Sequence, residues 1–181
     1  PADPGTLLEA SIGDVARAIG EVIDEVRPDV VVTLDGSDGH RDHVRIRDAT
    51  IRAVDQASWQ VPRLYLWCLA RSLMQRWAEH LRTLDPSSSY LELGLLGTPD
   101  EEITTIVDVS EHYEKRWEAI RIHGSQTSPY EGLPTELQRS FLATDRFKRL
   151  RPPWIPGEPE RELFHSDRAG VVAGGIVAGD T

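Results

Sequence analysis

The sequence has 181 residues, of which 39% are hydrophobic and 28% charged, so it can form one globular domain with a hydrophobic core. The formal net charge of -10 argues against nucleic acid as a partner, because an acidic surface repels phosphate groups. The single cysteine, Cys68, excludes an intramolecular disulfide and a cysteine-based zinc cluster. No segment has the roughly 20 apolar residues that a membrane span needs, and we expect a cytoplasmic location.

The amino-terminal part of the chain predicts a helix, a strand and a second helix. Apolar residues recur at helical spacing over residues 11–26, and Pro28 ends this helix. Residues 29–34 contain three consecutive valines, which is typical of a strand that is buried on both faces. Residues 35–39 are rich in Gly and Asp and predict a loop, and residues 42–57 again show helical spacing.

The same alternation continues along the chain and then weakens. We expect a strand over residues 64–69, a helix over residues 70–84, a strand over residues 103–109 and a helix over residues 110–124. The weaker expectations are a strand over residues 90–96, a short helix over residues 134–142 and an irregular proline-containing loop over residues 151–159.

This order of elements predicts an α/β fold of the Rossmann-like type, with a mostly parallel sheet and helices on both of its faces. We expect a single domain over residues 1–168 and a tail rich in Gly, Ala and Val over residues 169–181. Ligands of such sheets bind at the carboxyl ends of the strands. The loop that follows residues 29–34 lies at such an end.

That loop leads into the most informative motif, Gly39-His40-Arg41-Asp42-His43. Two histidines three residues apart at the start of a helix can point at one ligand. One can bind a metal while the other transfers protons near neutral pH, and Asp42 can orient a histidine. The same residues are also compatible with a polar loop in which Asp42 only caps the helix.

The wider segment resembles the LmbE/PIG-L family of zinc-dependent de-N-acetylases. The family block Pro-Asp-Val-Val-Val-Thr, followed by Gly-His-x-Asp-His, is similar to residues 28–33 and 39–43. A second family block, Lys-x3-Ala-x3-His-x-Ser-Gln, is similar to residues 115–126. The late Glu162-Leu163-Phe164 also resembles the usual ending of the family. The resemblance covers most of residues 7–165.

The resemblance implies a hydrolase that removes an acetyl group from an N-acetylglucosamine conjugate or a similar small-molecule amide. His43 matches the histidine that binds zinc. His40 matches the catalytic histidine that acts as general acid and stabilises the oxyanion, and Asp42 matches the carboxylate that tunes it. The residues implied to lie near the substrate are His123, Ser125 and Gln126.

The sequence departs from the family in one respect. The family enzymes begin with a strand that ends in Ala-His-Pro-Asp-Asp-Glu, which supplies two further zinc ligands and the aspartate that activates water. This motif is not present in the sequence, and Asp35 and Asp38 are more typical of turn formers. We therefore expect a fold that is incomplete on its amino-terminal side, with an incomplete zinc site.

Three hypotheses remain open. The chain, which begins with Pro1, is part of a zinc hydrolase whose first strand is missing from the sequence, cleaved or lost. Alternatively, it is a non-catalytic α/β binding domain derived from the family. In the third hypothesis it is a subunit that another chain completes, and the formation of a homo-oligomer is compatible with each of these.

Overall fold

The computed structural model describes residues 6–125 and 128–164. The helices and strands of these ranges are α1 (Ile12–Val26), β1 (Val30–Leu34), α2 (Arg41–Gln56), β2 (Arg63–Cys68), α3 (Arg71–Leu84), β3 (Thr105–Asp108), α4 (Tyr113–Ile122), α5 (Thr135–Leu142) and β4 (Thr144–Arg151). Short 3-10 helices are η1 (Ser89–Glu92), η2 (Asp100–Glu102) and η3 (Ser110–His112). The predicted α/β class is confirmed, whereas the predicted tail over residues 169–181 lies outside the described residues.

The sheet is mixed, and the prediction of a mostly parallel sheet was wrong. Its strand order is β1-β2-β4-β3, and only β1 and β2 run parallel. β4 enters between β2 and β3 and is antiparallel to both. The parallel pair arises because α2 carries the chain back across the sheet between β1 and β2, as in other crossover connections. The second half of the sheet contains no such pair because β4 runs against its neighbours.

β4 could not be predicted because its sequence does not resemble a central strand. Five of its eight residues are charged, and only Phe147 is buried. The charges are tolerated because they meet partners: Asp145 pairs with Arg116 at 2.8 Å, and Arg149 pairs with Glu160. The strand predicted over residues 90–96 is also absent from the described structure, where η1 occupies part of that segment.

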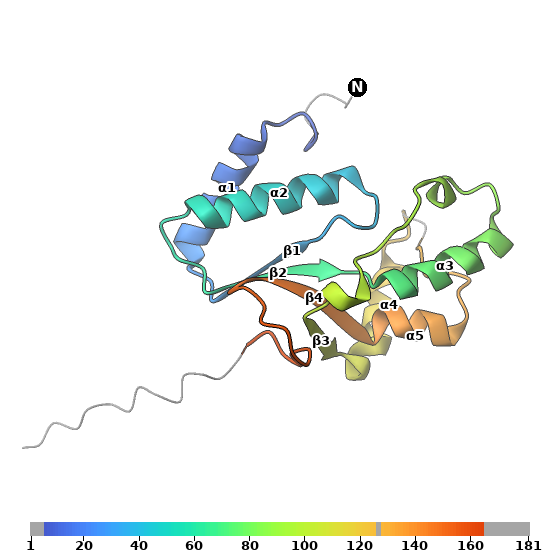
Figure 1. Cartoon of the computed structure of the whole chain (residues 1–181). Helices are drawn as coiled ribbons and strands as arrows, with labels where there is room; N and C mark the ends of the chain where they lie inside the picture. The colour runs from blue at the N-terminus through green and yellow to red at the C-terminus, as the bar shows by residue number, and fades with distance from the viewer. Residues whose placement is uncertain (1–5, 126–127, 165–181) are drawn as a thin grey trace, which may run out of the picture.

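The helices form two groups, each with its own apolar cluster. α1 and α2 lie side by side over β1 and β2 (Figure 1) and bury small and branched side chains between them. This α1–α2 cluster consists of Ala16, Ile23, Ala49, Ala53, Val54, Ala57, Val61 and Leu64. Small alanines in α2 allow the two helices to approach closely.

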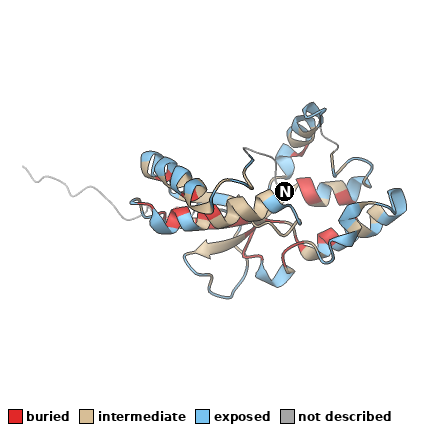
Figure 2. Cartoon of the chain, turned by 90° about the horizontal axis from the view of Figure 1, so that it is seen from above, coloured by how far each residue is buried: buried red, intermediate tan, exposed pale blue. Residues whose placement is uncertain are grey.

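The other three helices build a second cluster beside β3 and β4. This α3–α5 cluster consists of Ala70, Leu73, Met74, Trp77, Ile103, Tyr113, Leu137, Phe141 and Leu142. Figure 2 shows buried residues on the inward sides of both helix groups and exposed residues on their outer sides. The sheet and the loops at its end therefore lie between two separately packed bodies of side chains.

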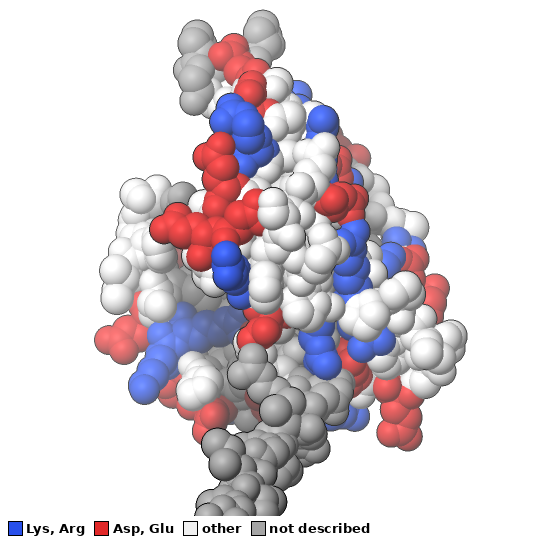
Figure 3. Space-filling view, turned by 90° about the vertical axis from the view of Figure 1, so that its left-hand side faces the viewer, with Lys and Arg blue, Asp and Glu red and all other residues white. Residues whose placement is uncertain are grey.

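Basic and acidic side chains are interspersed on the face shown in Figure 3, without an extended surface of one sign. Along α1, opposite charges also form local pairs, since Arg17 contacts Asp14 at 3.1 Å and Glu21 at 3.3 Å. Within the described ranges, no helix is long and apolar enough to cross a membrane.

Candidate functional site

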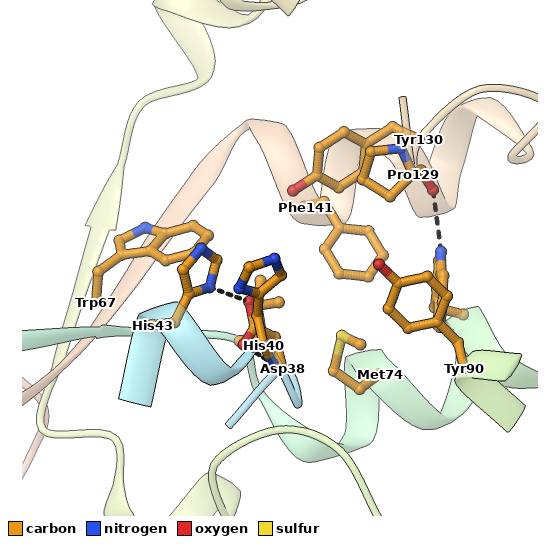
Figure 4. Close-up of a pocket in the computed structure, with 11 residues that line it drawn as sticks. Asp38, His40, His43, Trp67, Met74, Tyr90, Pro129, Tyr130 and Phe141 are labelled. Atoms are coloured by element: carbon orange, nitrogen blue, oxygen red, sulfur yellow. Dashed lines mark hydrogen bonds and ion pairs between the residues drawn. The ribbon is translucent and has the colours of Figure 1, made fainter. Parts of the chain in front are cut away.

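The histidine motif lies where the sequence placed it, after the carboxyl end of β1. Residues 35–39 form the turn from β1 into α2, and His40 is the residue before the first turn of α2. Gly36 and Gly39 take positive φ angles of 72° and 83°, which favour glycine. These two glycines bend the loop so that both histidines face the interior of the same cavity (Figure 4).

The two histidines form one unit that Asp38 holds in place. Their rings stack with centroids 4.5 Å apart and planes 28° apart. One carboxylate oxygen of Asp38 lies 2.5 Å from Nδ1 of His43, and the other accepts the backbone N–H of His40 at 3.0 Å. Because Nδ1 of His43 faces this carboxylate, Nε2 is the nitrogen that remains for a ligand.

Asp35 anchors the loop to a distant part of the chain. Its carboxylate accepts the backbone N–H and the hydroxyl of Ser37, at 3.0 and 2.6 Å, and also the hydroxyl of Thr98. The backbone N–H of Gly97 donates to the carbonyl of Ser37 at 2.8 Å. The guanidinium of Arg47 donates to the carbonyl of Asp35 at 2.9 Å. These bonds fix the loop between α2 and the segment that precedes η2.

The cavity beside the histidines has a volume of about 470 Å³, which is within the usual range for small-molecule sites. Its lining comprises Asp38, His40, His43, Trp67, Leu69, Met74, Trp77, Tyr90, Pro129, Tyr130 and Phe141. The histidines and Trp67 are at one side, and Tyr90 and Tyr130 are at the other (Figure 4). The site therefore has a titratable end and an aromatic end.

Several aromatic side chains of the lining are held by hydrogen bonds to the protein. The indole N–H of Trp67 donates to Asp145 at 2.9 Å, and that of Trp77 donates to the carbonyl of Pro129 at 3.0 Å. Trp77 also meets the ring of Tyr90 edge-on, with centroids 5.7 Å apart. Burial raises the pKa of Tyr130 above its ordinary value of 10.0, so its phenol stays a hydrogen-bond donor well into the alkaline range.

The structure brings together some of the predicted site residues and separates others. His40 and His43 line the cavity, whereas Asp42 is not part of that lining. One carboxylate oxygen of Asp42 is buried and has no hydrogen-bond partner among the described residues. His123 and Ser125 are exposed at the end of α4 and do not contribute to the lining, and Gln126 lies outside the described residues. The roles of these residues remain predictions.

Sequence reasoning missed Asp38 and most of the aromatic wall. Asp38 was interpreted as a turn former, and it does form a turn while also holding His43. Trp77 belongs both to the α3–α5 cluster and to the cavity. Pro129 and Tyr130 follow the predicted 123–126 block closely and line the cavity. No spacing pattern in the sequence identifies them.

The side chains in the described part of the chain do not fit a complete zinc site. Three His, Cys, Asp or Glu side chains usually hold a catalytic zinc, and no group of three or more suited to a metal occurs among the described residues. His43 has the form of a single ligand, since a carboxylate holds one ring nitrogen and leaves the other free. Further ligands would have to come from outside these residues.

The fold and the site define an α/β protein with a histidine pair in a ligand cavity at the end of a strand. Residues 4–54 match the family described as PIG-L: GlcNAc-PI de-N-acetylase. This range contains α1, β1, the histidine loop and most of α2. This match over residues 4–54 agrees with the PIG-L/LmbE resemblance that the sequence motifs predicted.

Relatives that are similar over most of the chain agree with this match. The chain is 37% identical, over 70% of its own length, to a 1D-myo-inositol 2-acetamido-2-deoxy-alpha-D-glucopyranoside deacetylase of Mycobacteroides abscessus, 46% of which is covered. It is 33% identical, over 89% of its length, to the protein of the same name from Thermomonospora curvata, 62% of which is covered. The chain thus spans about half to three fifths of the length of these relatives.

Proposed function

We propose that this chain forms the histidine-bearing part of a zinc-dependent de-N-acetylase site that acts on N-acetylated amino-sugar conjugates. The observation that carries the proposal is the stacked pair of His40 and His43, held by Asp38 at the wall of a ligand-sized cavity. The relatives named above support the reaction class, since each is named a deacetylase of an acetamido sugar.

In the proposed reaction, water and an acetamide become acetate and a free amine. His40 is exposed at the cavity, so its protonated imidazole can donate a hydrogen bond to the amide oxygen as negative charge develops there. The same imidazole can then give its proton to the departing nitrogen as the carbon–nitrogen bond breaks. His43 would hold the metal through Nε2, with its ring orientation set by Asp38.

The position of β1 supports the proposal that the remaining ligands come from a further strand. Among the described strands, β1 lies at one edge of the sheet and pairs with β2 on one side. A parallel strand added along its other side would end beside residues 35–43, because parallel strands have their carboxyl ends at the same edge of a sheet. Ligands at the end of such a strand would approach Nε2 of His43.

The test compares three variants of the chain, each studied within the longest natural protein that contains it. We expect His43→Ala to lose its bound zinc. The same variant should also no longer release acetate from N-acetylglucosaminyl inositol. His40→Ala should keep its zinc and lose roughly 100-fold or more in rate, which is typical of removing a general acid. His112→Ala is the matched control, because His112 is an exposed histidine that lies 3.3 Å from Glu111 and outside the cavity lining.

Zinc content is measured by elemental mass spectrometry and acetate by a coupled assay. If His43→Ala keeps both zinc and activity, the proposal is wrong.

A second candidate function is a binding domain without catalysis. It is favoured by the lack of a three-ligand metal group among the residues that the structure covers. Under this alternative, N-acetylglucosaminyl inositol binds in the cavity, no acetate is released, and zinc is not retained in stoichiometric amount. The same set of measurements therefore separates the two functions.

A further inference from the structure

We infer that the cavity selects amides that carry an aromatic or other flat apolar group, in preference to amides that carry a polyol such as inositol. The inference rests on the proposed function, since it places the acetamide at His40 and His43. It concerns the other end of the same cavity, where the substrate's remaining part would lie.

The walls of that end are apolar and aromatic. Met74, Trp77 and Phe141 are at most 7% exposed, and they belong to the packed α3–α5 cluster as well as to the cavity. Tyr90 and Tyr130 add two further rings, and Figure 4 shows them across from the histidines with Phe141 and Met74 between. Aromatic pairs in offset or edge-on geometry add stabilisation beyond the area that they bury.

The polar groups of the lining are few and mostly engaged. Both indole N–H groups donate to the protein, the one of Trp67 to Asp145 and the one of Trp77 to Pro129. Asp38 is occupied by His43 and by the backbone of His40. Among the described residues, the lining contains no Lys, Arg, Asn or Gln. Beyond the histidine end, two tyrosine hydroxyls are the main polar groups that face a ligand.

Such a wall offers few hydrogen-bond partners to the hydroxyl groups of a polyol. Each hydroxyl that leaves water without a hydrogen-bond partner costs about 1–3 kcal/mol in proteins. A phenyl ring has no hydroxyl groups, and its binding free energy becomes more favourable with the apolar area that it buries. With about 470 Å³, the cavity has the volume of a site for a drug-sized molecule, so a substituent of this kind has room beside the acetamide.

The test uses two probes that differ only in the group attached to the sugar, phenyl N-acetyl-β-glucosaminide and methyl N-acetyl-β-glucosaminide. Dissociation constants are measured by isothermal titration calorimetry on the full chain, and acetate release is followed for both probes and for N-acetylglucosaminyl inositol. We expect the phenyl compound to bind at least about tenfold more tightly than the methyl compound, and the inositol conjugate to bind no better than the methyl compound.

Two variants locate the preference within the cavity. Tyr90 is 49% exposed at the aromatic end, so Tyr90→Ala should fold and should weaken binding of the phenyl compound several-fold, and more than binding of the methyl compound. Leu95→Ala is the control, because Leu95 is 72% exposed nearby in the chain and is not part of this lining. It should leave both dissociation constants as they are.

The outcomes distinguish this inference from the proposed function. Equal binding of the phenyl and methyl compounds, tightest binding of the inositol conjugate, or no binding of any probe overturns the inference, even if acetate is released. A clear phenyl preference without release of acetate from any probe supports the apolar cavity and contradicts the proposed hydrolase. An equal loss in Tyr90→Ala and Leu95→Ala also overturns the inference, because the preference would then not arise in the cavity.

Discussion

Asp38 connects the two histidines through its two carboxylate oxygens, one on the ring of His43 and one on the backbone of His40. A hydrogen bond to a charged group contributes about 1.5–3 kcal/mol, which is enough to favour one tautomer of a neutral imidazole by about tenfold or more. We therefore expect Asp38→Ala to convert His43 from the Nδ1–H tautomer to a mixture.

Nitrogen-15 shifts of the histidine rings, recorded by NMR at pH 8, measure this change directly. Asp85→Ala is a suitable control, since Asp85 makes the same kind of turn to the backbone N–H of Ser87 at an exposed site. Unchanged ring shifts of His43 in Asp38→Ala would show that Asp38 does not set the tautomer.

Cys68 provides a prediction of pH dependence. Burial, with a further effect from Asp35, raises the pKa of its thiol from an ordinary 9.0 to about 12. As the pH rises, the Cys68 thiol therefore loses its proton in the unfolded chain before it does so in the folded chain. The contribution of the neutral buried thiol to the free energy of unfolding is fully present below pH 9. It is lost as the pH rises from 9 to 12.

Between pH 9 and pH 10.5 the loss from this one group amounts to roughly 1.5 kcal/mol in the free energy of unfolding. Urea denaturation at these two pH values should show this excess loss in the natural sequence compared with Cys68→Ala. If both proteins lose the same stability over this interval, the thiol is not held in its neutral form.

Parts of the site were visible in the sequence at the level of single residues. His40 and His43 were predicted because paired histidines follow a valine-rich strand, and the structure places both at the cavity. Asp38 could not be predicted as their partner, because an Asp between glycines is equally typical of a simple turn. The choice between the two depends on the ring position of His43, which only the fold determines.

The loop between β1 and α2 contains Gly36, whose surroundings differ from those of Gly94. At Gly36 an added Cβ would lie 2.8 Å from the side chain and 2.9 Å from the backbone of Val44, in the first turns of α2. At Gly94 it would meet nothing within 4 Å, although φ is similarly positive, 77° against 72°. Gly94→Ala thus isolates the conformational cost of positive φ.

We expect Gly94→Ala to lower the free energy of unfolding by about 1 kcal/mol, and Gly36→Ala to lower it by at least about 2 kcal/mol more. Urea denaturation of the two variants measures the difference. Equal losses would mean that α2 can move away from the loop without cost.

At the level of elements, prediction succeeded where the hydrophobic pattern was repeated and failed where ion pairs replaced it. α1, β1, α2, β2 and α3 follow from apolar spacing and from turn residues. β4 is central in the sheet but carries charges that are neutralised by residues far along the chain, among them Asp55, Glu102 and Arg116. Such partners cannot be identified before the fold is known, so the parallel arrangement was overestimated.

On the scale of the whole molecule, Glu160 attaches the segment after β4 to the sheet. It pairs with Arg149 and accepts the hydroxyls of Thr105 at 2.8 Å and Tyr65 at 3.3 Å, so it contacts β4, β3 and β2. The side chains of the Arg149–Glu160 pair are 13% and 8% exposed. Removing one partner of a buried pair leaves an uncompensated charge.

Glu160→Ala should therefore lower the free energy of unfolding by about 3 kcal/mol or more. Glu102→Ala removes the partner of Lys148 from a pair that is 35% and 44% exposed, and it should cost less than about 1 kcal/mol. Thermal and urea denaturation of both variants provide the comparison. Similar losses in the two would mean that the segment around Glu160 contributes little to the fold.

The cavity takes its histidines from the helix of the α1–α2 cluster and much of its aromatic wall from the α3–α5 cluster. The width of the cavity is therefore the distance between the α1–α2 cluster and the α3–α5 cluster. Near the histidine loop, hydrogen bonds connect Asp35 and Ser37 to residues 97–98. A ligand that touches both walls acts as a bridge, and its binding free energy is added to their association. Substitutions deep within either body can consequently alter ligand affinity without touching the ligand.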